Sequence, residues 1–309
     1  MTEARKIDGE NVSKAMGGEP LQVIPVERMN DLIDILHKDI PYSLHVEGMV
    51  KNIIRWRKNK EIPNDYELYA PFGDVNSGSC IGIFKSNEQQ MEIGFHSLNK
   101  DSAVLDALLT TSLIDWGAEK KLCFFHAVSE KVMPILEEII EKKNLIMEIN
   151  TPTVRFWMEK ERAINLKVEC PPDVEIKPLS PNMAAYLDEY WPHRFEGSDE
   201  YFRSLIERNF GIGVFIKNVE MPVAWVLLNQ FSCMFSLCTL EAQRKKGYAQ
   251  LVCNAMAKRQ AEMDVVPTAT VLDNNQPSKN LFVKMGYLTG DAAYFVGLKT
   301  RSNSCEIKS

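Results

Sequence analysis

The chain has 309 residues, of which 45% are hydrophobic and 25% are charged, and its formal net charge is −6. This size and composition fit a globular protein with room for two hydrophobic cores. The acidic balance argues against a nucleic-acid partner, since nucleic-acid binders need a basic face. Apolar runs such as residues 222–228 are too short to span a membrane, so we expect no membrane partner.

Residues 1–20 are charged, rich in glycine and without an apolar centre, which predicts a disordered tail and no secretory signal. They also lack the pattern of an Arg-rich amphipathic transit peptide. We therefore expect a cytoplasmic protein, with the mitochondrion as the alternative. The seven cysteines are odd in number and form no C-x-x-C pair, which fits reduced thiols. The five histidines lack metal-ligand spacing, so we expect no metal site.

After the tail, residues 21–26 alternate like a strand, contain a proline and lead into a helical pattern at 29–36. The patterns that follow predict strands at 66–72, 79–85 and 91–95, a helix at 102–120, a strand at 121–127, a helix at 130–143 and an apolar strand at 154–158. This order of strands and helices predicts an α/β unit.

The clearest boundary is Cys170-Pro-Pro-Asp-Val174, because two consecutive prolines cannot lie inside a helix or a central strand. The strand–proline–helix opening of the first half recurs directly after it. Both halves also end in an apolar strand, at 154–158 and at 293–297. We infer two tandem α/β domains, residues 21–168 and 173–309, each with a mixed, mostly antiparallel sheet flanked by helices.

The second half gives the sharper patterns, since its apolar positions follow strand or helix periods closely. They predict helices at 182–190 and 199–209, strands at 212–217, 223–229 and 233–240, a helix at 248–263, a strand at 268–272, a helix at 276–285 and a strand at 292–299.

The basic turn Arg244-Lys-Lys-Gly-Tyr-Ala249 follows the apolar strand Phe235-Ser-Leu-Cys-Thr-Leu240 and opens the predicted helix 248–263. A helix start presents unpaired N–H groups and a partial positive charge, so it can bind phosphate groups. Gly247 has no Cβ to hold a phosphate away from the backbone, and Ala249 is small. The turn therefore predicts a pyrophosphate site. A solvated basic turn is the alternative.

These residues resemble a known superfamily. Arg244-x-x-Gly247-x-Ala249 is similar to the coenzyme A pyrophosphate loop of the GNAT acyltransferases, whose consensus is Q/R-x-x-G-x-G/A. Asn275-x-x-Ser278 and Lys284-x-Gly286-Tyr287 resemble the motif that follows it. The resemblance implies that two neighbouring strands splay apart and that coenzyme A lies in the gap.

A closer resemblance is to the glycine N-acyltransferases and their relatives. It rests on Pro222-Val-Ala-Trp225, Asn229-Gln230, Thr239-Leu240 and, near the other end, Pro41-Tyr-Ser-Leu-His-Val-Glu-Gly48. The likeness is strong over residues 175–298 and weak over 21–160.

The resemblance implies acyl-CoA or acetyl-CoA as co-substrate. Its expected contacts are Leu237, Cys238, Thr239, Leu240, Arg244, Lys245, Lys246, Gly247, Tyr248, Ala249, Asn275, Ser278 and Phe282. In the first half the corresponding turn is His96-Ser-Leu-Asn-Lys-Asp101, which has no glycine and carries an acidic side chain. We infer that the first domain is degenerate and has lost its cofactor loop.

The implied reaction is direct acyl transfer to an amine in a ternary complex. It needs a proton acceptor for the ammonium group and a backbone N–H for the thioester oxygen, and Cys238, Thr239 and Leu240 are our backbone candidates. The family's general base falls on Cys233, and the general acid of many GNAT enzymes falls on Phe282. Neither residue performs that role well.

Three other side chains are candidate bases, each with an ordinary structural alternative. His193 lies in the loop that follows Trp191 and is otherwise an exposed loop histidine. Glu241 follows the strand and is otherwise a surface charge paired with Lys245. Asp273 follows the strand 268–272 and is otherwise a helix cap. Cys233 is otherwise a buried thiol.

We expect an acyl-CoA N-acyltransferase whose acceptor is a small amine or an amino acid such as glycine. The alternative is an acyl-CoA sensor or scaffold with little or no turnover, which the loss of the family's base and acid favours. A P-loop nucleotide site is a weak third reading, because the turn lacks G-x-x-x-x-G-K-[ST]. The sequence leaves the acyl-chain length and the oligomeric state open.

Overall fold

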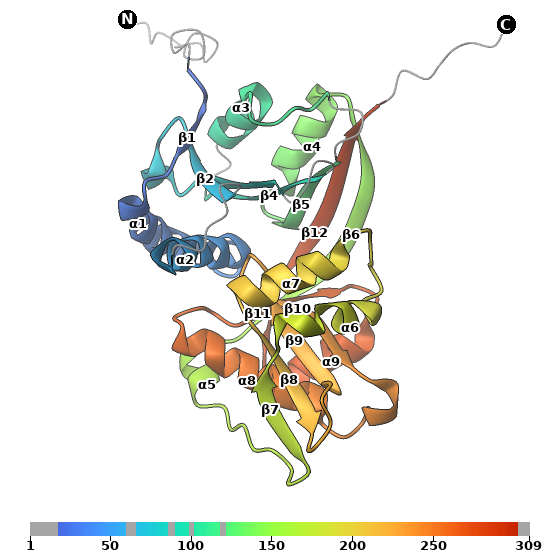
Figure 1. The fold of residues 1–309 in the computed structure, drawn as a ribbon. Coiled ribbons are helices and arrows are strands. Elements are labelled where there is room, and N and C mark those ends of the chain that lie inside the picture. Colours follow the sequence, from blue (N-terminus) through green and yellow to red (C-terminus); the bar gives the residue numbers. More distant parts are fainter. Residues whose placement is uncertain (1–17, 60–65, 86–89, 99–101, 118–121, 302–309) are drawn as a thin grey trace, which may run out of the picture.

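The computed structural model describes residues 18–59, 66–85, 90–98, 102–117 and 122–301. One continuous 12-stranded sheet runs through the molecule in the order β1-β2-β3-β4-β5-β12-β6-β11-β10-β9-β8-β7 (Figure 1). Most neighbouring strands are antiparallel, whereas β4–β5 and β10–β11 are parallel. The mixed, mostly antiparallel sheet agrees with the predicted fold class.

Among the described residues, the N-terminal half contributes β1 to β6 and four α-helices. Its strands are β1 Leu21–Val23, β2 Tyr66–Pro71, β3 Cys80–Lys85, β4 Gln90–His96, β5 Leu122–Ser129 and β6 Leu145–Trp157. Its helices are α1 Val26–Leu36, α2 Leu44–Asn59, α3 Ser102–Thr110 and α4 Met133–Lys142. Side chains of α3 and α4 share one core cluster with this half of the sheet, and those of α1 and α2 share another.

The described part of the C-terminal half, up to residue 301, contributes β7 to β12 and five α-helices. Its strands are β7 Val174–Pro178, β8 Gly211–Ile216, β9 Ala224–Leu228, β10 Met234–Thr239, β11 Thr268–Leu272 and β12 Leu288–Thr300. Its helices are α5 Lys160–Ile164, α6 Ala184–Glu189, α7 Ser198–Arg208, α8 Tyr248–Glu262 and α9 Gln276–Met285. The helix α8 covers one face of these strands, and α6 and α7 cover the other.

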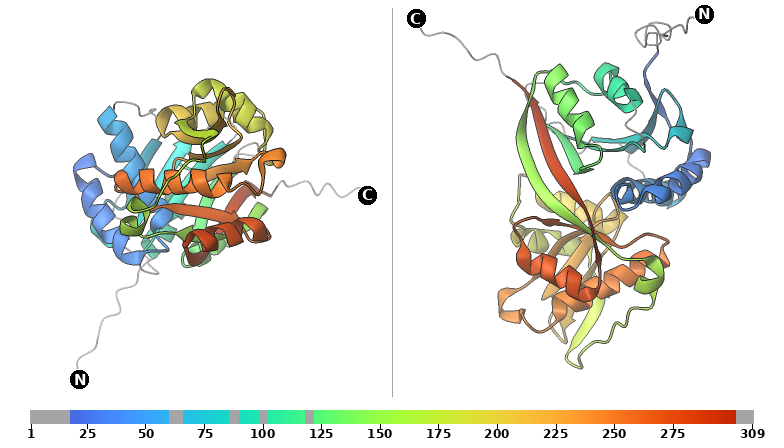
Figure 2. Two further views of the ribbon diagram at one scale, coloured as in Figure 1. Left: turned by 90° about the horizontal axis from the view of Figure 1, so that it is seen from below. Right: turned by 180° about the vertical axis from the view of Figure 1, so that it is seen from behind.

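The two halves exchange their last strands, which the sequence does not predict. The strand β6 pairs with β11 of the C-terminal half, and β12 lies between β5 and β6. Accordingly Phe156 of β6 is buried in the C-terminal core, and Val296 of β12 is buried in the N-terminal core. Figure 2 shows β6 and β12 running together from one half into the other.

The helix α2 contacts the C-terminal half, and the sequence patterns miss this helix. Its face toward the C-terminal half is polar: the Asn52 amide donates to the backbone oxygens of Asn229 and Gln230, at 3.3 Å and 3.0 Å. Trp56 Nε1 donates to Asn209 Oδ1 at 3.0 Å. Because these buried polar groups interrupt the apolar stripe, the segment lacks the usual pattern of an amphipathic helix.

The turn between β9 and β10 inserts into the N-terminal half. Phe231 is 0% exposed, and its ring centroid lies 4.0 Å from that of His45 and 5.5 Å from that of Phe84. A Cβ added at Gly94 would lie 2.5 Å from the Phe231 ring, so the phenyl group occupies space that only a glycine leaves open. The core of the N-terminal half is therefore completed by a residue of the other half.

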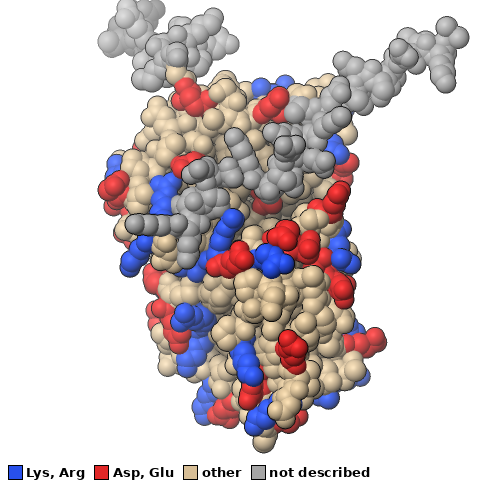
Figure 3. Space-filling model, in the orientation of Figure 1, with Lys and Arg blue, Asp and Glu red and all other residues tan. Residues whose placement is uncertain are grey.

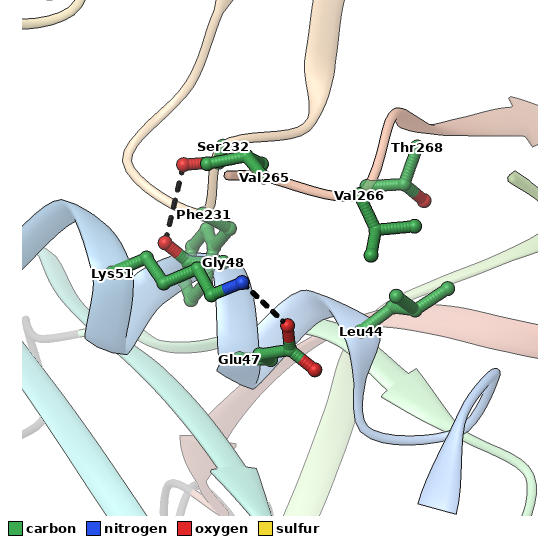
Figure 4. A pocket seen from close by; sticks show the side chains of 9 residues that line it. All are labelled: Leu44, Glu47, Gly48, Lys51, Phe231, Ser232, Val265, Val266 and Thr268. Atoms are coloured by element: carbon green, nitrogen blue, oxygen red, sulfur yellow. Dashed lines mark hydrogen bonds and ion pairs between the residues drawn. The ribbon is translucent and has the colours of Figure 1, made fainter. Parts of the chain in front are cut away.

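A hollow beside this turn is drawn in Figure 4. It is lined by Leu44, Glu47, Gly48, Lys51, Phe231, Ser232, Val265, Val266 and Thr268. The Lys51 ammonium pairs with the Glu47 carboxylate at 3.0 Å, and Ser232 Oγ donates to the Gly48 carbonyl at 3.1 Å (Figure 4). The hollow thus belongs to the contact between the halves.

The predicted helix 102–120 is too long, because α3 ends at Thr110. The next two residues bind the Glu19 carboxylate: Thr111 Oγ1 donates at 2.5 Å, and Ser112 N at 3.0 Å. Hydroxyl side chains that bond outside the helix favour its termination. Residues 118–120 of that prediction lie outside the described residues, as do residues 1–17 of the tail, residues 99–101 of the degenerate turn and Cys305.

Five cysteines of the described residues are free thiols: Cys80, Cys170, Cys233, Cys238 and Cys253. No helix among the described residues is both long and apolar enough to cross a bilayer. No group of three or more metal-binding side chains occurs there either. The domain boundary near residues 169–172 stays a prediction.

Candidate functional site

The strand β10 has an open edge although it lies inside the sheet. It pairs with β9 from Met234 to Thr239, but with β11 only at Met234 and Ala269. Beyond that point β10 is half-buried, whereas every residue of β9 is buried. The two parallel strands therefore diverge, as the resemblance to GNAT proteins implies.

A bulge lies where β10 leaves β11. The β9–β10 register shifts between Phe235 and Cys238, and Ser236 has a φ of 52°. A bulge breaks the ladder and re-aims backbone groups. The predicted contacts Leu237, Cys238 and Thr239 follow it, and Leu240 comes directly after the strand, with its N–H bonded to the Val223 carbonyl.

The predicted pyrophosphate turn follows β10 through a short 3-10 turn, Glu241–Gln243. Gly247 is the N-cap of α8 with a φ of 83°, and no side chain caps this helix. A Cβ added at Gly247 would meet nothing within 4 Å, so its positive φ, not crowding, favours glycine here. Lys245 also has a positive φ, 64°. Positive φ values beside an uncapped helix start are typical of an anion-binding turn.

The basic side chains of the turn face solvent. Arg244, Lys245 and Lys246 are exposed, Ala249 is half-buried and Tyr248 is buried. Glu241 is exposed, and its expected pairing with Lys245 stays a prediction. Figure 3 shows acidic and basic side chains interspersed over one face of the molecule.

The helix α9 begins with the predicted Asn275. Its Oδ1 accepts from the backbone N–H of Ser278 at 3.2 Å, so both residues form the helix cap. Asp273 pairs instead with Lys279 at 3.0 Å, and its expected role as the cap is wrong. Phe282 is buried, with its ring 5.6 Å from Phe156 and 5.0 Å from Tyr287. Its contact with a cofactor stays a prediction.

Aromatic side chains cover β10 on the side of α6 and α7. The Trp191 ring lies 5.2 Å from Phe235 and 5.4 Å from Phe202. Tyr201 meets Phe235 edge-on at 5.8 Å. His193 is exposed at the rim, with its ring 5.9 Å from Trp191. We call this group of Trp191, Tyr201, Phe202 and Phe235 the aromatic cluster.

Next to the aromatic cluster lies a second group of aromatic residues. Trp225 is buried, and its Nε1 has no hydrogen-bond partner among the residues that the structure describes. Its ring lies 5.9 Å from Tyr186 and 5.5 Å from Tyr190. The pKa of Tyr186 is raised to about 12. Burial is the largest cause, and the neighbouring Tyr190 is the second. Burial also raises the pKa of the Cys238 thiol on the same face. These groups stay neutral at physiological pH.

Cys233 stands where the resemblance places a general base, but it is closed off from solvent. The side chain is 1% exposed, and Sγ lies 3.9 Å from Thr270 Oγ1. Burial raises the pKa of the thiol to about 11, which the charge of Arg155 only partly offsets. The thiol therefore stays protonated at neutral pH, as in the alternative of an ordinary buried cysteine.

Three further residues, Tyr201, Gln230 and Glu92, lie in contact beside the aromatic cluster. Tyr201 OH donates to Gln230 Oε1 at 2.9 Å, and Gln230 Nε2 donates to the Glu92 carboxylate. Gln230 belongs to the Asn229-Gln230 pair that carries part of the resemblance. Glu92 is a buried charged residue between the apolar Met91 and Ile93 of β4, a pattern that can mark a functional carboxylate.

The chain is similar to known proteins in both sequence and fold. The sequence model of the FR47-like protein family matches residues 211–296. No curated protein sequence matches the chain. A crystal structure of a Drosophila protein is similar, with 21% identity, a TM-score of 0.78 and coverage of 92% of this chain and 100% of that one.

Two further solved structures have lower sequence identity. A tandem GNAT protein from the clavulanic acid biosynthesis pathway has 9% identity, a TM-score of 0.52 and coverage of 90% of this chain and 97% of that one. A GCN5-related N-acetyltransferase from Sphaerobacter thermophilus has 9% identity and a TM-score of 0.51, and the match covers 90% of this chain and 94% of that one. The chain therefore has the fold of the tandem GNAT proteins, and its FR47-like segment contains the open strand and the basic turn.

Proposed function

We propose that the chain is an acyl-CoA N-acyltransferase that acylates a small amine or an amino acid such as glycine, as glycine N-acyltransferases do. The divergence of β10 from β11 directly before an uncapped, basic helix start carries this proposal. The pyrophosphate of coenzyme A would bind the backbone N–H groups at the start of α8. The pantetheine arm would pair with the open edge of β10.

The reaction is a direct transfer in a ternary complex. The neutral amine attacks the thioester carbon, and a backbone N–H of β10 after the bulge stabilises the oxygen that becomes negative. The carbon–sulfur bond then breaks, and the coenzyme A thiolate takes up a proton. The acceptor amine approaches from the side of the aromatic cluster, because α8 covers the other face of β10.

The proton acceptor is the incomplete part of this site. Cys233 is excluded from that role by its burial and its raised pKa. His193 remains a candidate, because it is exposed beside Trp191 at the rim of the aromatic cluster. Glu241 is an exposed carboxylate one residue beyond Leu240, between β10 and the basic turn, and is the other candidate.

A second candidate function has its own support. The position of the family's general base holds the buried thiol of Cys233, and the position of the general acid holds Phe282, which is buried in the core. A protein that keeps the cofactor turn without these groups would bind acyl-CoA as a sensor or scaffold with little or no turnover.

Calorimetry and a thiol-release assay separate the two functions. We expect acetyl-CoA to bind, and free thiol to appear when glycine or another small amine is added. Binding without thiol release over a broad amine panel supports the sensor, and the absence of binding contradicts both functions.

Charge reversal of the turn tests the proposed cofactor site. We expect the K245E/K246E variant to bind acetyl-CoA at least tenfold more weakly, because both ammonium groups lie beside the expected pyrophosphate. The K38E/K167E variant changes the net charge equally at exposed positions elsewhere and serves as the control. Unchanged affinity of K245E/K246E would rule out the site.

A further inference from the structure

A chain of buried polar contacts links the aromatic cluster to the N-terminal half. It runs from Tyr201 on α7 through Gln230 in the β9–β10 turn to Glu92 on β4. Gln230 is 1% exposed and Glu92 is 6% exposed, so water does not compete for these contacts. His126 Nε2 lies 3.1 Å from the same Glu92 oxygen. Figure 1 shows α7 between the two halves, where it can take part in this link.

The carboxylate sets the direction of every hydrogen bond in this chain. An ionised carboxylate only accepts, so Gln230 must turn its NH₂ group toward Glu92 and its carbonyl oxygen toward Tyr201. That oxygen only accepts as well, so the Tyr201 hydroxyl must donate to it. The Tyr201 hydroxyl thus donates its hydrogen to Gln230. The lone pairs of the Tyr201 oxygen can still accept a hydrogen bond from another donor.

Tyr201 lies where a donor would arrive during acyl transfer. Its ring contacts Phe235, and Phe235 directly precedes the Ser236 bulge, after which the thioester oxygen would bind. An ammonium or amine group carries N–H donors, and it also interacts favourably with aromatic faces. The acceptor amine of the proposed reaction can donate a hydrogen bond to the Tyr201 oxygen and can also pack against the rings of the aromatic cluster.

We propose that Tyr201 is a positioning residue for the acceptor amine, with a phenolic oxygen that accepts a hydrogen bond from the amine and is directed by Glu92 through Gln230. This inference rests on the proposed function and extends it. Burial, and then the charge of Glu92, raise the pKa of Tyr201 well above its usual value. The hydroxyl thus stays protonated and holds the amine without taking its proton.

The inference gives the N-terminal half a part in the acceptor site. Glu92 touches no substrate in this arrangement, but it fixes the amide of Gln230 and through it the hydroxyl of Tyr201. A degenerate domain without a cofactor turn would then be retained because it supplies the carboxylate that orients a residue of the other half.

The first test is Tyr201→Phe, which removes the oxygen and keeps the ring. We expect the KM for glycine or phenethylamine to rise about ten- to hundredfold, the typical effect of losing a hydrogen bond to a charged group. The KM for acetyl-CoA should stay unchanged. Tyr69→Phe, which removes a hydroxyl from a half-buried tyrosine of β2, is the matched control and should leave both constants unchanged.

The second test exchanges the amide and the carboxylate. Q230E alone places two carboxylates against each other and should raise the amine KM at least as much as Tyr201→Phe. E92Q alone leaves two amides, which no longer fix the direction of the hydroxyl. The double variant E92Q/Q230E restores one carboxylate, which accepts from both Tyr201 and the amide at position 92, and should return the amine KM toward the wild-type value.

The same proteins are titrated calorimetrically with glycine and phenethylamine in the presence of saturating desulfo-CoA, which binds without reacting. This readout is independent of turnover. Weaker amine binding by Tyr201→Phe, with recovery in E92Q/Q230E, supports the inference even if the wild-type protein is only a sensor. An unchanged amine affinity in Tyr201→Phe, or equal loss of desulfo-CoA binding, overturns the inference alone. Wild-type protein that binds desulfo-CoA but no amine also overturns it, and failure to bind desulfo-CoA overturns the proposed function as well.

Discussion

His96 shows how a single buried side chain ties stability to pH. The imidazole is 0% exposed, and its Nε2 lies 2.8 Å from Asp39 Oδ2. Burial lowers the pKa of His96 from 6.5 to about 4, and the opposing effect of Asp39 is smaller. Between these two values the unfolded chain binds a proton that the folded protein does not. The free energy of unfolding therefore falls as the pH decreases through this window.

We expect this histidine alone to cost about 2 kcal/mol of stability between pH 7.5 and pH 5. Urea unfolding at both pH values measures the effect. The His96→Gln variant cannot take up the proton and should lose less stability over the same interval than the wild-type protein. His193→Gln changes an exposed imidazole and should follow the wild-type protein. Equal losses in His96→Gln and in the wild type would contradict this account.

Among the elements, the β9–β10 turn joins the two halves through side-chain contacts on both sides. Phe231 stacks on His45, lies 4.7 Å from His126, and packs where glycine leaves room. Gln260 Nε2 donates to the Ser232 carbonyl at 2.8 Å, which holds the turn from the side of α8. The turn is thus fixed from both halves, and its neighbour Gln230 is fixed with it.

Phe231→Ala is expected to lower the free energy of unfolding by about 3–5 kcal/mol, because it leaves a large cavity among buried rings. Chemical denaturation measures this loss. Phe72→Ala removes the same group from a site that is 47% exposed, and its effect should be below about 1 kcal/mol. Similar effects of the two substitutions would show that the turn does not support the N-terminal core.

Elements with a strong local pattern are predicted well from the sequence. The helix α9 spans 276–285 as predicted, because Asn275 caps its start and Gly286, with a φ of 83°, ends it. The strand β11 also has its predicted bounds. The turn before α8 is predicted from the residues of the turn alone. Their signals come from neighbours in the sequence, so no knowledge of the rest of the fold is needed.

Elements stabilised by distant contacts are predicted poorly. The polar face of α2 makes sense only once the C-terminal half lies against it. The strand β6 spans 145–157, whereas the sequence predicts only its last part, because its earlier residues are largely exposed. Similarly, the sequence predicts the residues expected to bind coenzyme A, but it does not predict a role for Tyr201 or Glu92. Gln230 and Glu92 are 138 residues apart, and no local pattern joins them.

At the scale of the whole molecule, the strand exchange makes the two halves one structure. The strand β12 lies between β5 and β6, and the buried pair of Arg155 and Asp291, 2.7 Å apart, joins β6 to β12. The segment between the halves, residues 165–173, is without regular structure and mostly exposed. Breaking that segment therefore leaves the contacts between the halves intact.

We expect a protein with a protease site inserted between residues 167 and 172 to be cut there without coming apart. The two fragments should elute together in gel filtration under native conditions and separate only in denaturant, because β6 and β12 stay paired with strands of the other fragment. The uncut protein is the control for the elution volume. Separate elution of the fragments in native buffer would contradict the exchange.

The exchange also has a consequence for biosynthesis. Thr153 of β6 bonds to the carbonyl of Ala293 of β12, a residue that is translated 140 positions later. Until β12 has been synthesised, one edge of β5 has no partner strand. The N-terminal half therefore cannot complete its sheet until β12 has been synthesised, and a premature stop before β12 leaves exposed strand edges that favour aggregation.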